Sequence, residues 1–124
     1  MKPEYAVAYN TLGTAYSNQG NLTKAIELCE KAIELDPEYA EAYFNLGNAY
    51  DEQGNLTKAI QNYEKAIELD LEDAVDAYYN LGLVYANQGN LTKDIELYEK
   101  AIELKPAYAL AYNNLGNAYY NQGN

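Results

Sequence analysis

The chain contains no histidine, no arginine and no tryptophan, and it has a single cysteine, Cys29. Histidine is the commonest general base and the commonest zinc ligand, so its absence removes Ser-His-Asp and Cys-His arrangements and the usual zinc sites. A single cysteine excludes an intrachain disulfide framework and fits a reducing compartment. We therefore expect a protein that is not an enzyme and has no metal site and no cofactor.

Long apolar runs are also missing. A membrane-spanning helix needs about 20 consecutive apolar residues, no run approaches this length, and residues 1–5 lack the apolar core of a secretory signal. Eight lysines stand against 19 acidic residues, which gives a formal net charge of -11. Such a surface repels phosphate backbones and anionic lipid. The composition therefore predicts a cytoplasmic protein that binds neither nucleic acid nor membrane and favours a neutral or basic polypeptide.

A motif of the form Tyr-x-x-Leu-Gly-x-x-Tyr occurs four times. Its glycines lie 34, 35 and 34 residues apart, at Gly13, Gly47, Gly82 and Gly116. A fixed period of this size is typical of a stacked array whose neighbouring repeats share one core. Apolar residues recur at helical spacing on both sides of an Asn-Gln-Gly-Asn turn, where Gly20 ends one helix and Asn21 caps the next. Each repeat is therefore predicted to contain two helices.

The glycine inside each first helix needs an explanation, because it costs about 1 kcal/mol relative to alanine. We interpret it as a point of close approach between paired helices, with Ala25 and Ala59 as the small residues opposite. Asp94 takes the place of these alanines in the third repeat. We expect this acid to lie against Gly82 with a local loss of packing, eased by its position in the first turn of a helix.

These residues resemble the tetratricopeptide repeat. The matching positions of the first repeat are Tyr9, Leu12, Gly13, Tyr16, Ala25, Cys29, Ala32 and Pro37. The resemblance divides a single domain, 1–124, into repeats 6–39, 40–74 and 75–108 and a terminal half repeat, 109–124. It implies an all-α solenoid of helix-turn-helix repeats that forms a right-handed superhelix, with the first helices lining a concave groove. The near-identical turns indicate recent duplication or consensus design.

Two features depart from the family pattern. Leu71 replaces the proline that usually closes a repeat and Ala74 is one residue extra, so we expect the preceding helix to continue through 68–74. The last repeat lacks a second helix. We therefore expect its outer face, with Leu115, Ala118 and Tyr119, to meet water. Either the chain is a fragment of a longer array, or two copies self-associate by burying this end against each other.

The acidic clusters do not predict a chemical site. Glu72, Asp73 and Asp76 lack the glycine turn and the roughly six to eight oxygen ligands of a calcium loop. The carboxylates of the second helices, such as Glu27 and Glu99, alternate with lysines. They indicate a solvated face that is supported by i,i+4 ion pairs.

The candidate binding site is the groove face of the first helices. Asparagine occupies one position in three successive repeats, at Asn45, Asn80 and Asn114, although it is a poor helix former. An amide offers a donor and an acceptor to the backbone of an extended peptide, and the arrangement resembles the asparagine ladders of some tetratricopeptide arrays. Copying by duplication is the alternative explanation. The predicted groove residues are Asn10, Thr14, Glu41, Phe44, Asn45, Asn48, Asp51, Glu52, Asp76, Tyr79, Asn80, Leu83, Asn113, Asn114, Asn117 and Tyr120.

Charge decides which peptide this groove is predicted to bind. Family members that bind acidic chaperone tails use a clamp of cations, and the matching positions here hold none, while Asp51, Glu52 and Asp76 would repel a carboxylate. Phe44, Tyr79 and Tyr120 offer stacking surface. We expect a protein-interaction module for an extended, neutral-to-basic peptide, and the alternative is a scaffold that assembles through its uncovered last helix.

Overall fold

The structure, a computed structural model, describes residues 3–69 and 74–123. These residues form seven α-helices and no strand, so the predicted all-α fold is confirmed. The helices are α1 (Pro3–Asn18), α2 (Leu22–Leu35), α3 (Ala40–Gln53), α4 (Leu56–Glu68), α5 (Ala74–Asn87), α6 (Leu91–Leu104) and α7 (Ala109–Asn121). The chain divides into two compact units, residues 1–71 (unit 1) and residues 72–124 (unit 2).

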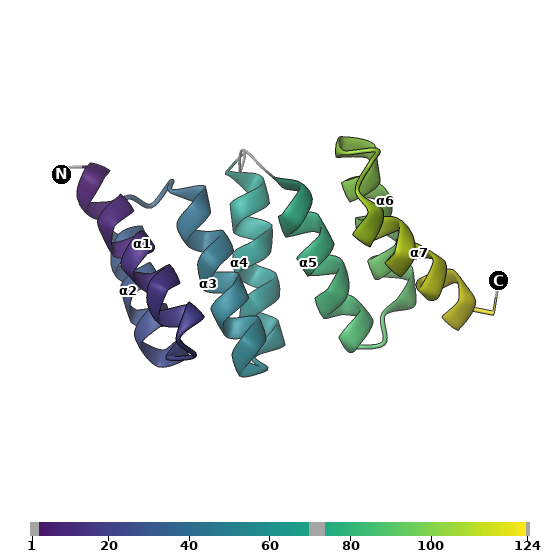
Figure 1. Cartoon of the computed structure of the whole chain (residues 1–124), viewed down its shortest axis with the longest axis horizontal. Coiled ribbons are helices and arrows are strands. Elements are labelled where there is room, and N and C mark those ends of the chain that lie inside the picture. The colour runs from purple at the N-terminus through teal and green to yellow at the C-terminus, as the bar shows by residue number, and fades with distance from the viewer. Residues whose placement is uncertain (1–2, 70–73, 124) are drawn as a thin grey trace. The chain divides into compact units, whose positions relative to one another are not determined.

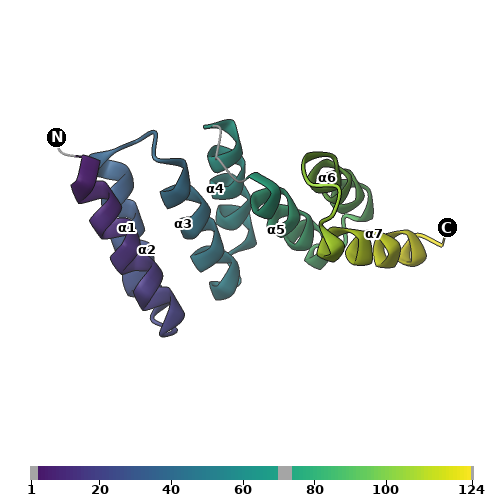
Figure 2. The same cartoon turned by 45° about the horizontal axis from the view of Figure 1, so that its top comes forward.

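Each unit is built from hairpins of two helices. In unit 1, α1 packs on α2 and α3 packs on α4, and α2 also packs on α3 (Figure 1). In unit 2, α5 packs on α6, and α6 also packs on α7 (Figure 2). A second helix such as α2 or α6 therefore contacts the first helix of its own repeat and that of the next repeat.

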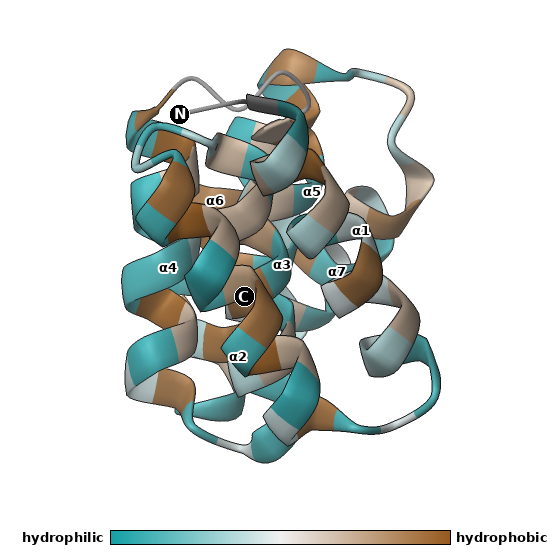
Figure 3. Cartoon of the chain, turned by 90° about the vertical axis from the view of Figure 1, so that its left-hand side faces the viewer, coloured by the Kyte–Doolittle hydropathy of each residue, from teal (hydrophilic) through white to brown (hydrophobic). Residues whose placement is uncertain are grey.

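Polar and apolar residues alternate around the helices (Figure 3). None of the described helices is long and apolar enough to cross a membrane. The exposed sides of the second helices carry ion pairs with N to O distances of 3.5–3.9 Å, namely Lys24–Glu27, Lys31–Glu34, Lys65–Glu68, Lys93–Glu96 and Lys100–Glu103. The predicted i,i+4 spacing is wrong, because each of these pairs forms at i,i+3. Exposed pairs of this kind contribute only about 0–1 kcal/mol each.

The hairpin turns follow from glycine and asparagine chemistry. Gly54 has a φ of 83°, in the left-handed region, and it ends α3. The next residue, Asn55, accepts a hydrogen bond at Oδ1 from the backbone N–H of Lys58 and so caps α4. The same arrangement recurs in the other two described hairpins, so the predicted caps are confirmed.

The glycine inside each first helix faces a side chain in the middle of the second helix. A Cβ on Gly47 would lie 2.8 Å from the ring of Tyr63, and a Cβ on Gly82 would lie 2.6 Å from the ring of Tyr98. Both rings are buried, with 0% and 1% exposure. The atoms nearest to these two glycines thus belong to a tyrosine ring, a contact that was not predicted beside Ala59.

The first repeat makes a smaller version of this contact. A Cβ on Gly13 would lie 3.0 Å from Cys29 Sγ and 3.3 Å from the carbonyl oxygen of Ala25. Ala25 therefore faces the glycine through its backbone only. Burial is the main reason that the pKa of Cys29 rises to about 11, and the negative charge of Glu30 adds to it. The thiol is accordingly a packing group.

Asp94 lies in the first turn of α6 and is 2% exposed. The closest atoms to Gly82 belong to Tyr98, so the expected place of Asp94 against Gly82 is taken by the tyrosine ring. The Oδ1 atom of Asp94 is buried without a hydrogen-bond partner. Burial raises the pKa of this carboxyl, and hydrogen bonds from backbone N–H groups at the start of the helix oppose the rise. Asp94 therefore lowers stability through the burial of its charge, where a loss of packing was expected.

The junction after α4 differs from the prediction. α4 ends at Glu68 with Leu69 as its C-cap, and α5 begins at Ala74. The helix was expected to continue through residues 68–74, but it ends at Glu68. Residues 70–73, which include Leu71, Glu72 and Asp73, lie outside the described residues.

The last helix also faces its neighbour differently from the prediction. Ala118 is 3% exposed and packs with Ile95 and Tyr98 of α6, and Leu115 packs against the same cluster. The expectation that Ala118 and Leu115 face water is therefore wrong, because α6 covers this side of α7. Tyr119 is exposed as predicted.

We expect Gly82→Ala to lower the free energy of unfolding by about 1–3 kcal/mol, because its methyl group would overlap the buried ring of Tyr98. Gly116→Ala is the matched control. A Cβ there meets nothing within 4 Å, so this change should stabilise the protein by about 1 kcal/mol through helix propensity. Urea unfolding followed by circular dichroism measures both, and equal effects would contradict the ring-on-glycine contact.

We expect Asp94→Ala to raise the free energy of unfolding at neutral pH by about 1–3 kcal/mol, because it removes a buried oxygen without a partner. The pKa of Asp94 is higher in the folded state than its ordinary value of 3.8. Its charge therefore destabilises the fold above the raised pKa, and this penalty disappears as the pH falls toward 3.8.

Urea unfolding of the unmodified protein and of Asp94→Ala, from neutral pH down to about pH 4, measures the difference between their free energies of unfolding. This difference should shrink as the pH falls. Glu30→Ala, at an exposed position, is the control and should leave the pH dependence unchanged. An Asp94→Ala variant that is less stable at neutral pH would contradict the assignment.

Candidate functional site

In unit 1, predicted groove residues of α1 and α3 bond to one another. Asn45 Nδ2 donates to Asn10 Oδ1 over 2.9 Å and to Thr14 Oγ1 over 3.2 Å. Asn10 Nδ2 donates to the hydroxyl of Tyr39 over 3.3 Å. Asn10 is only 7% exposed, so it lies between the repeats and is not open to a ligand. Asn45 therefore connects α3 to the neighbouring first helix, α1.

The C-terminal half of α3 carries acceptor groups. The hydroxyl of Tyr63 donates to Asn48 Oδ1, and it also hydrogen-bonds Asp51. The ring of Phe44 lies 5.9 Å from that of Tyr63, centre to centre. Burial first, and then the charge of Glu52, raise the pKa of Asp51, while the bond from Tyr63 lowers it. Glu52 is exposed beside Asp51 in the last turn of α3, and Glu41 is exposed in its first turn, so both ends of this helix carry negative charge.

Unit 2 repeats the asparagine link with tyrosines. Asn114 Nδ2 donates to the hydroxyl of Tyr79 over 3.1 Å, and Asn114 also hydrogen-bonds Tyr98. The ring of Tyr79 lies 6.0 Å from that of Tyr98 and 5.5 Å from that of Tyr108. Burial is the main reason that the pKa of Tyr98 rises to about 12. The face of unit 2 is thus aromatic where that of unit 1 is rich in amides.

Asp76 is less available to a ligand than Asp51 and Glu52. Its Oδ1 accepts a hydrogen bond of 2.7 Å from the hydroxyl of Tyr108. It lines a depression of about 300 Å³ together with Lys105, whose Nζ lies 5.5 Å from the centre of the Tyr108 ring. Because a cation shares this depression, Asp76 adds little to the attraction of a basic peptide.

The other predicted residues of unit 2 divide into packed and exposed groups. Leu83 packs against the cluster of Ile95, Tyr98 and Ala118, so its role is structural. Asn80 is partly buried and has interactions of its own. The exposed residues are Asn113, Asn117 and Tyr120, of which Tyr120 is 81% exposed.

Sequence reasoning missed the tyrosine hydroxyls that contact the site. Tyr63 and Tyr98 stand at the repeat position that Cys29 holds in the first repeat, where the family pattern indicates only a packing aromatic, and Tyr39 and Tyr108 were not singled out. The available signal was the choice of tyrosine over phenylalanine at buried positions, because a buried hydroxyl needs a hydrogen-bond partner. A second signal was the tyrosine two residues after Pro37 and after Pro106.

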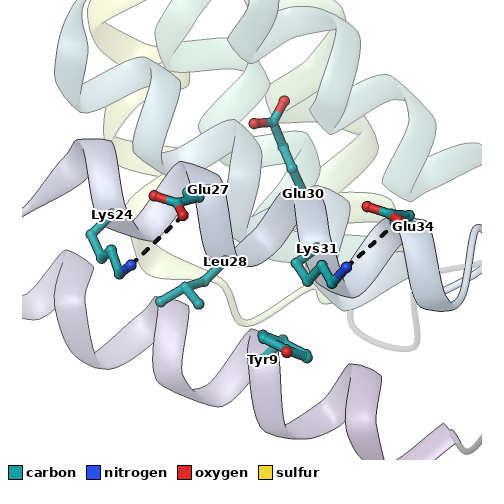
Figure 4. Close-up of a pocket in the computed structure, with 7 residues that line it drawn as sticks. All are labelled: Tyr9, Lys24, Glu27, Leu28, Glu30, Lys31 and Glu34. Carbon is teal, nitrogen blue, oxygen red and sulfur yellow. Dashed lines mark ion pairs between the residues drawn. The ribbon is translucent and has the colours of Figure 1, made fainter.

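A separate depression of about 430 Å³ lies between α1 and α2 (Figure 4). Tyr9 and Leu28 line it, and the ion pairs Lys24–Glu27 and Lys31–Glu34 border it. Figure 4 shows Glu30 pointing away from Tyr9. The two lysines are already paired, so they do not form an anion site. Among the described residues, no three His, Cys, Asp or Glu side chains come together in a group that could hold a metal ion.

Comparison with known families identifies tetratricopeptide repeats along the chain. Three family profiles described as tetratricopeptide repeat match residues 4–72, 47–109 and 97–124. The chain belongs to the tetratricopeptide repeat family. Its fold is thus an all-α helical-repeat solenoid, and tetratricopeptide repeats are protein-interaction modules. No curated protein matches the sequence.

Several solved tetratricopeptide repeat structures are similar to the chain. A crystal structure of MamA is 39% identical with a TM-score of 0.90, over 98% of this chain and 71% of that one. YrrB, described as having an unusual peptide-binding site, is 28% identical with a TM-score of 0.85, over 95% and 60%. The first tetratricopeptide domain of Spaghetti (RPAP3), bound to the HSP90 peptide SRMEEVD, is 22% identical with a TM-score of 0.93, over 100% and 98%. At that identity the last likeness concerns the fold alone.

Proposed function

We propose that the chain binds an extended, neutral-to-basic peptide on the first helices of its units. The observation that carries this proposal is the set of acceptors on α3. Both hydrogens of the Asn45 amide are donated to α1, so this amide offers a ligand its carbonyl oxygen. The carboxylates of Asp51 and Glu52 lie on the same helix. Acceptors and negative charge together select N–H groups and cationic side chains.

Unit 2 would contribute contacts of another kind. Tyr79 and the highly exposed Tyr120 offer aromatic surface. Asn113 and Asn117 are exposed amides that can donate and accept. We assign to this unit the stacking of apolar or aromatic side chains and polar contacts to the peptide backbone.

The solved relatives support peptide binding in general, but they do not indicate which peptide this chain binds. YrrB is described as having a peptide-binding site, and RPAP3 is bound to a peptide in its structure. The peptide bound to RPAP3 contains three acidic residues and one arginine. Asp51 and Glu52 would repel such a ligand, so we propose a peptide of the opposite charge for this chain.

A second candidate function is self-assembly as a scaffold. The observation that favours it is the uncovered side of α7, where Tyr112 is 50% exposed, Tyr119 is 37% exposed and Gly116 has no neighbour within 4 Å of its Cβ position. This surface replaces the predicted one, since Leu115 and Ala118 pack against α6.

We expect a labelled lysine-rich peptide to bind more tightly than its glutamate counterpart and to lose affinity as salt is added. The double variant Asp51→Asn, Glu52→Gln should weaken binding by about threefold to tenfold, since it removes two carboxylates at the site. Glu30→Gln, Glu34→Gln is the matched control, with the same change of net charge on α2. Fluorescence anisotropy at two salt concentrations measures all of these. Preference for the acidic peptide, or an equal loss in the control, would refute the charge assignment.

Self-assembly predicts that the weight-average mass rises with protein concentration. Light scattering over a concentration series measures it, without any ligand. A strictly monomeric chain at high concentration would exclude the scaffold function and would leave the peptide-binding proposal unaffected.

A further inference from the structure

The first helix of the chain has an uncovered side that sequence analysis did not consider. Ala8, Leu12 and Ala15 follow one another at spacings of four and three residues on α1, and all three are exposed, Leu12 at 47%. Their equivalents on α3 are Ala42, Leu46 and Ala49, which are 0%, 5% and 0% exposed. The difference arises because α2 packs on α3, whereas no described helix precedes α1.

The uncovered side of α7 has the same spacing with the opposite sizes. Tyr112, Gly116 and Tyr119 also follow at four and three residues. α1 presents a small, a large and a small side chain, and α7 presents a large, a minimal and a large one. Side chains at this spacing form the contact stripe of two helices that pack nearly parallel.

The alternation of large and small side chains extends by one more position toward the N-terminus of both helices. Tyr5, three residues before Ala8, is 53% exposed, and Ala109, three residues before Tyr112, is exposed and small. A parallel alignment therefore places Tyr5 over Ala109, Tyr112 over Ala8, Leu12 over Gly116 and Tyr119 over Ala15. Each large side chain meets a small one at four successive positions.

We propose that α7 of one copy of the chain binds α1 of a second copy in this register, with Leu12 inserted over Gly116. The inference rests on the proposed self-assembly and names its two surfaces. They differ from each other, so the contact is heterologous and each copy can bind two others. Association then continues beyond a dimer into a ring or a filament.

The charge distribution favours this contact over other surfaces of an acidic protein. α7 contains no charged residue and α1 contains only Glu4, so joining them buries little charge. The net charge of -11 on each copy still opposes association at long range. Added salt should therefore strengthen the self-association, whereas it weakens the binding of a basic peptide.

The test uses two variants that each disable one surface. Leu12→Glu disables the α1 side and Gly116→Glu disables the α7 side, and each adds one negative charge. Both positions are exposed, and a Cβ at Gly116 meets nothing within 4 Å, so the monomer tolerates the changes. Val7→Glu, at 48% exposure on α1 but off the stripe, is the matched control. Circular dichroism and thermal melts check that the variants fold.

Sedimentation velocity at high salt should show the unmodified chain and Val7→Glu forming oligomers. Each of the other variants alone should be monomeric. An equimolar mixture of Leu12→Glu and Gly116→Glu should form a species of twice the monomer mass and nothing larger, because only one pair of intact surfaces remains. If Leu12→Glu or Gly116→Glu alone still associates, self-assembly stands and this interface is wrong. If the unmodified chain never associates, the scaffold function fails as well.

A cross-linking experiment gives an independent answer where a glutamate variant unfolds. Copies carrying Leu12→Cys are mixed with copies carrying Gly116→Cys and oxidised, and Cys29 is buried and out of reach. Heterodimers should exceed the half share expected from random pairing. A random distribution of the three possible dimers would overturn the proposed register.

Discussion

The packing of a second-helix side chain on the bare backbone of a first-helix glycine is the contact on which each hairpin depends. It holds Tyr63 on Gly47 and Tyr98 on Gly82, with both rings buried. The hydroxyls of the same tyrosines reach Asn48 and Asn114 on first helices. One residue thus fills the core and fixes a polar side chain of the candidate site, so packing errors at the glycine would also displace the site.

The asparagine ladder serves the array before it serves a ligand. Asn45 donates both of its amide hydrogens, to Asn10 and Thr14, across 35 and 31 residues, and Asn114 donates to Tyr79 across 35 residues. These bonds offset the poor helix propensity of asparagine without any peptide. In the proposed binding mode, a ligand meets the hydrogen-bonding groups that these bonds leave unused, which are acceptors. The acidic residues nearby on α3 are acceptors as well.

Local chemistry made the helices, turns and caps predictable, because Gly54 and Asn55 act through their own backbone and nearest neighbours. Contacts between helices were less predictable. The repeat motif marks Leu115 and Tyr119 alike as packing residues, but Leu115 packs against the cluster of α6, whereas Tyr119 is 37% exposed and reaches α6 with its hydroxyl, which donates to Glu99 Oε2 over 3.4 Å. Helical spacing likewise sufficed to predict groove residues, whereas two hydroxyl contacts, Tyr39 accepting from Asn10 and Tyr108 donating to Asp76, depend on how loops between repeats bring distant hydroxyls to the first helices.

The position of charge along the chain explains how an acidic protein can keep neutral contact surfaces. Five ion pairs join lysines and glutamates of the second helices. Among the first helices, α3 carries Glu41, Asp51 and Glu52, whereas α7 carries no charge. We therefore expect a basic peptide to be attracted to an inner helix, while the helices with an uncovered side are left almost neutral. Because salt weakens the first interaction and relieves the repulsion that opposes the second, the two activities should respond to ionic strength in opposite directions.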